Sequence, residues 1–498
     1  MPLPKNRASR ILEKYKTQTP LHFIDGLFVE STGNETIRIL NPANNTAIGR
    51  IASGNEIDVE KAVLSSKNAF EKSWRREHPE RRAKILTNIA TRIEQEGNDL
   101  AILESLQTGK TYRETLTHDV ANAIKVLKYY AGWVGKYAGD ALQLGPSTTG
   151  LVFHEPYPVV GALLSWNAPL LSATWKVAAA IAAGTTIVLK PSELSPLTTL
   201  RLADLLLESG TPPGVVNVVT GHGAKTGQAL ARSPYLDTIL FSGSIESARH
   251  VLVSAAKSNL KSVQLTTGGK SANIIFEDAN VKEACTAAWQ AIFNNRGEVC
   301  TAGSRLLVHD SLYDHVVNVV TQRARELNLG DPLDEHTEMG PVISEDHLKR
   351  VLSYISLARK EGARLVAGGG RDVVGLRAQG NFVEPTVFMN VTANMRIAQE
   401  EIPGPVLSIM RFRTEEEAIR IANGTDYGIA NGIWTQDISR AQRMIRNLSS
   451  GIVWVNGYGV FDPSIPFGGT NLSGHARDLG KEGLAQFCYS KSVFISNS

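Results

Sequence analysis

Residues 159–190 read VVGALLSWNAPLLSATWKVAAAIAAGTTIVLK, and this stretch decides the fold class. It opens on the apolar run Val159–Leu164, continues with a helical pattern over Ser172–Ala183 and closes on the β-branched run Thr186–Leu189. That succession predicts a strand, a helix and a second strand. Because such connections are right-handed crossovers, we expect the two strands to lie parallel in one sheet.

The same alternation continues further along the chain. A helix over Thr199–Ser209 ends at a glycine followed by two prolines, and the strand-like runs Val215–Val219 and Thr238–Phe241 come next. A second alternation runs from Ala272–Phe276 to Ile452–Val455. The sequence therefore predicts an α/β protein with two doubly wound, parallel-sheet domains.

Three segments stand outside the two alternations. Val120–Val134 has apolar residues at helical spacing and predicts an amphipathic helix. Asp140–Tyr157 and Tyr489–Ser496 read as short strands. We expect these strands to form either a small sheet between subunits or ordinary sheet edges, and the pattern alone leaves both interpretations open.

Composition and charge exclude several classes of protein. The 498 residues carry 52 Lys and Arg against 49 Asp and Glu, and a formal charge of +3 offers no basic surface for nucleic acid. No apolar run approaches the roughly 20 residues of a membrane helix. The polar, basic N-terminus lacks the pattern of a signal peptide. We therefore expect a cytoplasmic protein that binds neither nucleic acid nor membrane.

The sequence also argues against three kinds of reactive centre. Its three cysteines, Cys285, Cys300 and Cys488, are too few and too scattered for a disulfide framework. The histidines form no ligand cluster, so no metal site is predicted. The Gly-x-Ser-x-Gly turn of many serine hydrolases is absent.

Two glycine turns follow strands of the first alternation. Val215–Thr220 leads into GHGAKTG at residues 221–227, which includes Gly223 and Gly227, and Phe241-Ser-Gly-Ser244 follows the next strand. Both turns precede helices, an arrangement that lets backbone N–H groups approach a phosphate. Because the spacing departs from G-x-G-x-x-G, a plain chain reversal is the alternative to a dinucleotide site.

A charged turn lies at the end of another strand. Lys190-Pro-Ser-Glu193 falls at the carboxyl edge of the predicted sheet, where open α/β sheets bind ligands. Lys190 and Glu193 could both hydrogen-bond a ribose diol. A solvated pair around a proline turn is the alternative.

Cys300 differs from the other two cysteines in its surroundings. It lies in NNRGEVCTAGSR at residues 294–305, a polar segment with glycines on both sides. Cys285 and Cys488 lie within apolar patterns that we interpret as helical, where a thiol is most often a small buried hydrophobe. We expect the loop around Cys300 to stabilise and expose a thiolate.

Taken in order, these residues resemble the aldehyde dehydrogenase superfamily over nearly the whole chain, from about His22 to Ile495. Seven segments carry the resemblance. They are Ser165-Trp-Asn-Ala-Pro169, Lys190-Pro-Ser-Glu193, Phe241-Ser-Gly-Ser244, Gly268-Gly-Lys270, the Cys300 loop, Glu400-Glu-Ile-Pro-Gly-Pro405 and Pro466-Phe-Gly-Gly469.

The resemblance implies a role for each matching position. Cys300 would be the nucleophile, and the Asn167 amide would stabilise the oxyanion that forms when a thiolate adds to an aldehyde. Hydride would pass to NAD, with NADP as a second candidate cofactor, and water would release a carboxylic acid. The cofactor would be bound by Trp166, Lys190, Ser192, Glu193, Gly223, Gly227, Phe241, Gly243, Ser244 and Glu401.

Three positions depart from the family's usual pattern. Thr266 occupies the place of the glutamate that activates the deacylating water, so the general base is missing. Pro403 and Ala168 replace bulkier residues and leave more room near the centre. Asp478 and Glu298 are candidates for a substitute base, although each could be structural.

The resemblance implies an NAD-dependent oxidation of an aldehyde to an acid. The alternatives are an enzyme that transfers the acyl group to coenzyme A, and a catalytically weak family member with a binding or structural role. We expect residues 1–124 and 147–266 to form an NAD-binding domain and 267–465 a catalytic domain. Residues 125–146 and 466–498 would bridge the subunits of a homodimer or homotetramer.

Overall fold

The quoted stretch forms the centre of the first sheet in the computed structural model, which describes residues 4–19 and 21–496. The sheet has the order β11-β10-β7-β8-β9-β1-β2, and its first five strands are parallel. The two antiparallel strands come from the N-terminal region. The strands are β1 (His22–Ile24), β2 (Leu27–Val29), β7 (Val159–Leu163), β8 (Thr186–Lys190), β9 (Val216–Val218), β10 (Thr238–Ser242) and β11 (Ser262–Thr266).

Helices cover both faces of this sheet, because successive strand residues point to opposite sides. Val160 and Ala162 of β7 join the core beneath one helical layer, whereas Val159 and Leu163 join the core beneath the other. The first layer contains α3 (Pro79–Thr108), α5 (Ala121–Trp133), α6 (Pro169–Ala183) and α7 (Leu197–Glu208). The second contains α2 (Glu56–Lys72), α8 (Gln228–Arg232) and α9 (Ile245–Ala256).

The second sheet has the order β14-β15-β16-β13-β12-β18-β19 and is parallel except for β14. Its strands are β12 (Ala272–Ile275), β13 (Arg305–His309), β14 (Arg364–Ala367), β15 (Thr386–Met389), β16 (Val406–Phe412), β18 (Ala430–Trp434) and β19 (Ile452–Val455). One face packs on α10 (Val281–Phe293) and α11 (Tyr313–Glu326), and the other on α12 (Glu345–Lys360), α14 (Glu415–Asn423) and α15 (Ile438–Asn447). The predicted fold class is confirmed.

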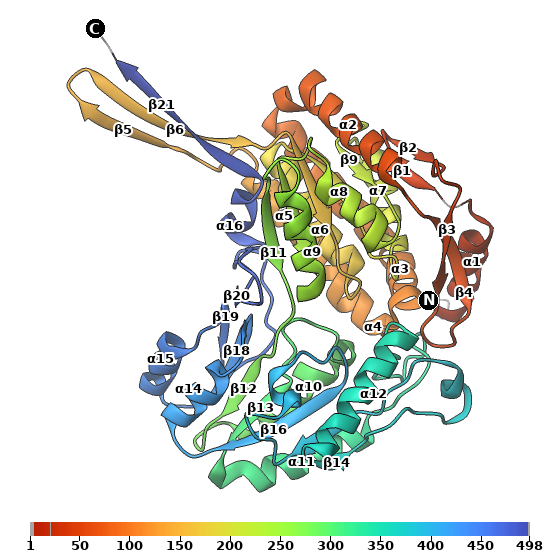
Figure 1. Cartoon of the computed structure of the whole chain (residues 1–498), viewed down its shortest axis with the longest axis vertical. Coiled ribbons are helices and arrows are strands. Elements are labelled where there is room, and N and C mark those ends of the chain that lie inside the picture. Colours follow the sequence, from red (N-terminus) through yellow and green to blue (C-terminus); the bar gives the residue numbers. More distant parts are fainter. Residues whose placement is uncertain (1–3, 20, 497–498) are drawn as a thin grey trace.

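A third, antiparallel sheet extends away from the body of the molecule (Figure 1). It consists of β5 (Asp140–Gly145), β6 (Thr148–Pro156) and β21 (Cys488–Ser496), and β21 pairs with β6 from Cys488↔Pro156 to Ser496↔Thr148. We call these three strands the arm. The two segments predicted as strands therefore pair with each other, although they are far apart in the sequence.

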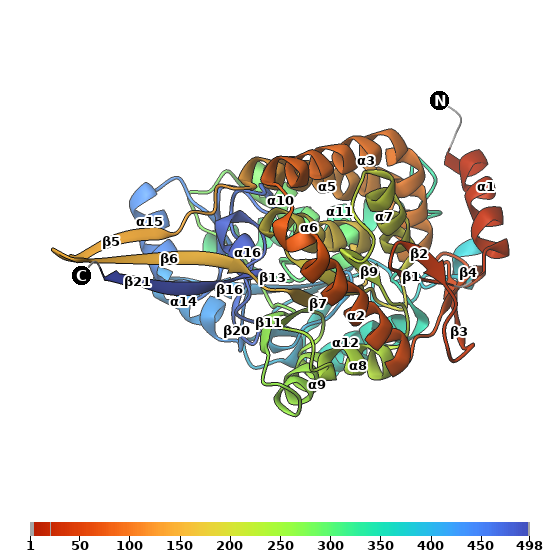
Figure 2. The same ribbon diagram turned by 90° about the horizontal axis from the view of Figure 1, so that it is seen from above.

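The arm and helix α1 (Pro4–Thr17) lie at opposite ends of the molecule (Figure 2). Helix α1 packs against the hairpin of β3 (Thr36–Leu40) and β4 (Ala47–Ala52). The remaining short elements are α4 (Tyr112–Glu114), α13 (Arg396–Gln399), α16 (Gly480–Ala485), and the pair β17 (Tyr427–Gly428) and β20 (Thr470–Asn471). None of the helices within residues 4–19 and 21–496 is both long and apolar enough to cross a bilayer.

Two details differ from the sequence expectations. The expected boundary at residue 125 falls inside α5, whose Val126, Leu127 and Tyr130 are buried in the core beside the first sheet. Cys488 does not lie in a helix, because it begins strand β21. In both cases the structure depends on packing against distant segments, which the spacing of apolar residues along the chain does not reveal.

Candidate active site

A pocket lies at the carboxyl ends of the first sheet's strands, where ligands of open α/β sheets bind. The segments that follow β7, β10 and β11 form one side of it, and the Cys300 loop and parts of the second domain form the rest. Its lining residues are Ser165, Trp166, Asn167, Ser242, Gly243, Ser244, Thr266, Thr267, Gly268, Gly297, Glu298, Val299, Cys300, His347, Arg350, Glu401 and Pro403.

The Cys300 loop begins with a strained turn. Asn295, Arg296 and Gly297 have φ values of 47°, 56° and 72°, the left-handed region that non-glycine residues rarely adopt. A Cβ on Gly297 would lie 2.2 Å from the carbonyl oxygen of Gly404, so only glycine fits here. Backbone strain of this kind is typical of functional sites when the surrounding structure enforces it.

An ion pair holds the turn. The Nε of Arg296 donates to the Glu298 carboxylate over 3.1 Å, and the other oxygen of Glu298 accepts the backbone N–H of Ile343 over 3.0 Å. Glu298 is 2% exposed. With both carboxylate oxygens engaged and buried, Glu298 is not placed to activate a water. The suggestion that it could replace the missing base is therefore wrong, and its role is structural.

Burial controls the chemistry of the Cys300 thiol. Burial and the nearby Glu401 carboxylate raise the pKa of Cys300 to about 12, and Asp478 adds to the shift. Both effects disfavour the thiolate. The backbone N–H groups of Cys300 and Thr301 act in the opposite direction and lower the pKa, so the loop itself favours the thiolate, but the effect of burial is larger. A positive charge beside the sulfur would be needed to favour ionisation.

Asn167 reaches the same loop from the segment after β7. Its Nδ2 donates to the carbonyl oxygen of Glu298 over 2.9 Å, which places the amide beside the segment that carries the sulfur. The backbone carbonyl oxygen of Asn167 accepts from the Nδ2 of Asn295 over 3.4 Å. The structure thus brings together Asn167 and Cys300, the two residues predicted to act on the carbonyl group.

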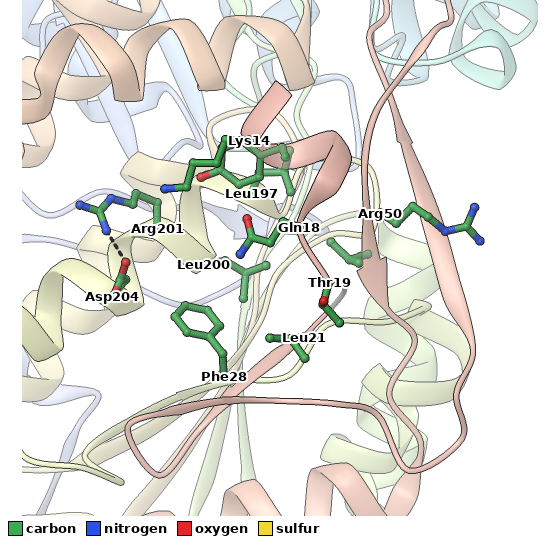
Figure 3. Close-up of a pocket in the computed structure, with 12 residues that line it drawn as sticks. Lys14, Gln18, Thr19, Leu21, Phe28, Arg50, Leu197, Leu200, Arg201 and Asp204 are labelled. Atoms are coloured by element: carbon green, nitrogen blue, oxygen red, sulfur yellow. Dashed lines mark hydrogen bonds and ion pairs between the residues drawn. The ribbon is translucent and has the colours of Figure 1, made fainter. Parts of the chain in front are cut away.

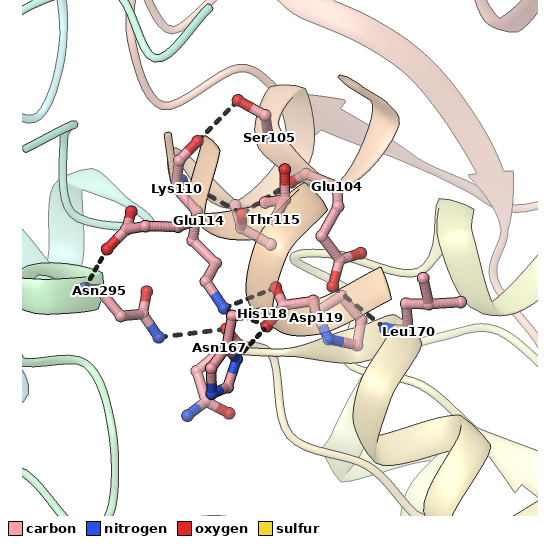
Figure 4. A network of polar contacts seen from close by, with 12 residues as sticks. Glu104, Ser105, Lys110, Glu114, Thr115, His118, Asp119, Asn167, Leu170 and Asn295 are labelled. Atoms are coloured by element: carbon pink, nitrogen blue, oxygen red, sulfur yellow. Dashed lines mark hydrogen bonds and ion pairs between the residues drawn. The ribbon is translucent and has the colours of Figure 1, made fainter. Parts of the chain in front are cut away.

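A buried polar network supports the backbone around Asn167 (Figure 4). The Glu104 carboxylate accepts the N–H of Leu170 at the start of α6 over 3.1 Å, and the Lys110 ammonium binds both oxygens of Asp119 at 2.9 and 2.6 Å. Burial raises the pKa of Glu104, and Asp119 adds to the rise. Because Glu104, Lys110 and Asp119 are all partnered, the network fixes the start of α6 and the segment in front of it.

Two residues bear on the missing base. Thr266 ends β11 and lines the pocket, and its hydroxyl is buried without a hydrogen-bond partner among the described residues. Asp478 is also buried, but it forms an ion pair with Lys176 of α6. Its charge raises the pKa of Cys300, so it lies within electrostatic range of the sulfur.

The groups expected to bind the adenine-side ribose lie together. The Lys190 ammonium is 3.1 Å from the Glu193 carboxylate, whose second oxygen accepts the Gly223 N–H over 3.4 Å. The hydroxyl of Ser192 accepts the N–H of Leu194 over 3.3 Å and thereby shapes the turn. Gly227 is buried at the end of the helical turn 223–227, away from this carboxylate's contacts.

The groups expected near the pyrophosphate and the nicotinamide line the pocket itself. Ser244 caps the twelve-residue helix α9, whose N-terminus faces the pocket edge. Phe241 is buried below Gly243, whose added Cβ would meet the ring at 2.7 Å. The Glu401 carboxylate lies so close to Gly268 that a Cβ there would meet it at 1.8 Å. Gly243, Ser244 and Glu401 line the same pocket as Cys300, whereas Lys190, Ser192 and Glu193 lie outside its lining.

Comparison with known proteins agrees with this geometry. The model of the aldehyde dehydrogenase family matches residues 28–493. The chain belongs to the aldehyde dehydrogenase family. It is thereby an oxidoreductase that acts on aldehydes with NAD.

Individual relatives are similar over their whole length. The human mitochondrial aldehyde dehydrogenase is 40% identical over 475 residues, which are 95% of this chain and 91% of that one. The NAD⁺ complex of a Bacillus cereus aldehyde dehydrogenase is 38% identical, with a TM-score of 0.95 over 98% of both chains. The Pseudomonas aeruginosa aldehyde dehydrogenase KauB is 39% identical, with a TM-score of 0.97 over 100% of both chains.

Two pocket residues of this aldehyde dehydrogenase were missed by the sequence analysis. His347 and Arg350 lie on the first turns of α12 and line the pocket opposite Trp166, whose ring meets that of His347 edge-on at 4.6 Å. Burial lowers the pKa of His347 to about 4, and Arg350 adds to the effect, so the imidazole is neutral. Burial raises the pKa of Glu401, and the positive charge of Arg350 partly offsets that rise. The Ser344 cap, the acidic first turn and the helical spacing of Leu348, Val351 and Ile355 predict this helix, but no local signal indicates that its first turns reach the pocket.

The aldehyde dehydrogenase also has aromatic side chains close to α6. The Trp175 ring stacks on Phe461 at 5.8 Å and meets Phe467 edge-on at 5.2 Å. The Trp175 indole N–H is buried without a hydrogen-bond acceptor among the described residues. Trp175 and Phe461 are thus adjacent, and Asn294 lies exposed at the start of the Cys300 loop.

A second cavity lies between α1 and α7 (Figure 3). Its volume is about 60 Å³, and its Arg201 is already paired with Asp204 and Glu96. A cavity of this size holds no more than a few waters. It lies beside the N-terminal helix and shares no lining residue with the pocket of Cys300.

Proposed function

We propose that this aldehyde dehydrogenase releases a free carboxylic acid and uses Cys300 as its nucleophile. The observation that carries the proposal is the shared pocket of Cys300 and Asn167. A thiol supplies the covalent step, and an amide N–H supplies the donor that a developing alkoxide requires.

The proposed reaction begins at the sulfur. A solvent water takes the proton of the thiol as sulfur bonds to the aldehyde carbon, and the π electrons of the carbonyl move to oxygen. The Nδ2–H of Asn167 and the backbone N–H of Cys300 would stabilise that oxygen. When bound, NAD⁺ supplies the acceptor for the hydride. The acyl group then remains on Cys300 as a thioester, and attack by water breaks the C–S bond and releases the acid.

The residues described above would hold the cofactor. Lys190 and Glu193 would bind the adenine-side ribose, and Glu401 would bind the nicotinamide-side ribose. Trp166, Ser192, Gly223, Gly227, Phe241, Gly243 and Ser244 would complete the site. The Glu193 carboxylate would disfavour a 2′-phosphate, so use of NADP would be weaker than use of NAD.

Hydrolysis of the thioester is the step that the replacement of the family's usual glutamate by Thr266 affects. Thr266 has no carboxylate to activate water. Asp478 is the substitute that we propose, acting through a water, because Lys176 binds its Oδ1, whereas both carboxylate oxygens of Glu298 are engaged, and because its charge reaches Cys300. Slow hydrolysis favours a second candidate function, in which coenzyme A takes the acyl group from Cys300. Ala168 and Pro403 would give the acyl chain additional room.

We also propose roles for the parts of the chain. Residues 1–124 and 147–266 would bind NAD together with the rest of α5, 267–465 would carry the nucleophile, and the part of 125–146 that follows α5 would link subunits together with 466–498. Exposed apolar residues on the arm support a homodimer or a dimer-based tetramer, since Leu142 is 51% and Phe494 72% exposed. The three free cysteines fit a cytoplasmic location.

A panel of aldehydes tests the proposal. NADH formation is followed with and without coenzyme A, for the unchanged enzyme and for Cys300→Ala. We expect acid as the product, loss of oxidation in Cys300→Ala, and unchanged NAD affinity. Cys285→Ala is the control, because Cys285 is buried in α10. An acyl-coenzyme A product would favour the second function, and turnover by Cys300→Ala would overturn the nucleophile.

A further inference from the structure

Ser165 makes a hydrogen bond whose only evident use is to orient Asn167. Its Oγ donates to the Asn167 Oδ1 over 2.7 Å. We propose that Ser165 is a positioning residue for the oxyanion donor: it holds the Asn167 side-chain amide in the orientation that directs an N–H at the substrate oxygen. The inference rests on the proposed role of Asn167.

Two partners determine which way the planar amide faces. Oδ1 accepts from Ser165, and Nδ2 donates to the carbonyl oxygen of Glu298 over 2.9 Å. A flipped amide would bring its oxygen against that carbonyl oxygen, and two acceptors repel. The amide is therefore held at both ends.

This arrangement leaves one donor for the substrate. An asparagine amide has two N–H groups, and Glu298 takes one of them. The second makes no hydrogen bond to the described residues, and Asn167 lines the pocket together with Cys300. Since the plane of the amide is fixed, the direction of the second N–H is fixed as well, as electrostatic preorganisation requires. A hydroxyl that donates to Oδ1 also makes the amide N–H a stronger donor.

The backbone of this segment does not depend on Ser165. The Asn167 backbone carbonyl oxygen is held by Asn295 and the Leu170 N–H by Glu104 (Figure 4). The Trp166 carbonyl oxygen accepts from the hydroxyl of Ser195 over 2.8 Å. The Ser165 side chain makes no other hydrogen bond among the described residues. Its hydroxyl therefore acts on the amide of Asn167 and not on the course of the chain.

A double-mutant cycle tests this coupling. The rate of the first turnover, measured as the fast phase of NADH formation, is compared for the unchanged enzyme, Ser165→Ala, Asn167→Ala and the double variant. We expect Ser165→Ala to slow the fast phase about 3- to 10-fold, as loss of one neutral hydrogen bond does. In the Asn167→Ala background the same change should have less than about a 2-fold effect. The affinity for NAD should not change.

Two further variants protect the test from failures of folding. Ser165→Thr and Ser165→Val have the same shape, and only threonine keeps the hydroxyl, so valine alone should be slow. Ser195→Ala is the control, because it removes a hydroxyl that binds the same segment at the Trp166 carbonyl oxygen and does not touch the Asn167 amide.

The outcomes separate the two claims. An equal loss from Ser165→Ala in both backgrounds, or equal rates for Ser165→Thr and Ser165→Val, would overturn the positioning role. A small effect of Asn167→Ala itself would instead overturn the proposed oxyanion role.

Discussion

Lys176 of α6 and Asp478, 302 residues further along the chain, form an ion pair in the interior, with side chains that are 3% and 7% exposed. The pair joins the helix that follows Asn167 to the segment that precedes α16. It also keeps a negative charge within electrostatic range of Cys300. Because both charges are buried, neither can lose its partner without a large cost.

We therefore expect Lys176→Met to destabilise the enzyme strongly. It leaves Asp478 as an unpaired buried charge, and removal of one partner of a buried pair costs about 3–5 kcal/mol in the free energy of unfolding. Urea denaturation measures this. Lys481→Met, at an exposed lysine in α16, is the control and should cost far less. A loss for Lys176→Met no larger than that of the control would mean that the pair is not closed in solution.

Alkylation of Cys300 should rise steadily with pH in the cofactor-free enzyme. Only the thiolate reacts, and burial with the nearby Glu401 raises the pKa of Cys300 to about 12. The rate of reaction with iodoacetamide, followed by mass spectrometry of the Cys300 peptide, should therefore not level off near about pH 8.5, where an ordinary thiol ionises.

Glu401→Gln should speed this alkylation at neutral pH. It removes a negative charge beside the sulfur, so the pKa falls and more thiolate is present. Glu400→Gln is the matched control, because Glu400 is paired with Arg396 and Tyr354 and is not among the groups that shift Cys300. A plateau near about pH 8.5 in the unchanged enzyme, or equal rates for the two variants, would contradict this electrostatic account.

Glu193 should determine the preference for NAD over NADP. Its carboxylate would accept from the ribose diol and repel a 2′-phosphate, while the adjacent Lys190 weakens that repulsion. Glu193→Gln should raise the ratio of kcat/KM for NADP to that for NAD by about 10-fold or more. Glu71→Gln, on the exposed side of α2, should leave the ratio unchanged. Equal use of both cofactors by the unchanged enzyme would refute the role of Glu193.

Removal of the residues after Phe487 should break the oligomer. The deletion takes away β21, which pairs with β6 along its whole length, and it exposes the edge of β6. Sedimentation velocity should show a dimer or tetramer for the full chain and smaller species for the truncated one. A full-length enzyme that is active as a monomer would disprove the assembly.

The sequence predicted those parts of the fold that depend on local patterns. The strands β7 and β8 and the helix between them follow from apolar periodicity, and the turn at Cys300 follows from its glycines. It did not predict that Arg296 would occupy the carboxylate of Glu298, because that contact depends on a left-handed turn. The pocket position of Arg350 and the partner of Asp478 also arise only when distant segments pack together.

One measurement tests the central claim, that Cys300 forms a thioester whose hydrolysis is slow because Thr266 cannot activate water. Rapid mixing of enzyme, NAD and aldehyde should give a burst of NADH of about one per active site, followed by a slower steady rate. Thr266→Glu should raise the slow rate by at least about 10-fold, since a general base contributes about 10²–10⁴. Thr266→Gln, of equal size but without the carboxylate, should not raise it. A linear time course without a burst, unchanged by Thr266→Glu, would contradict the account.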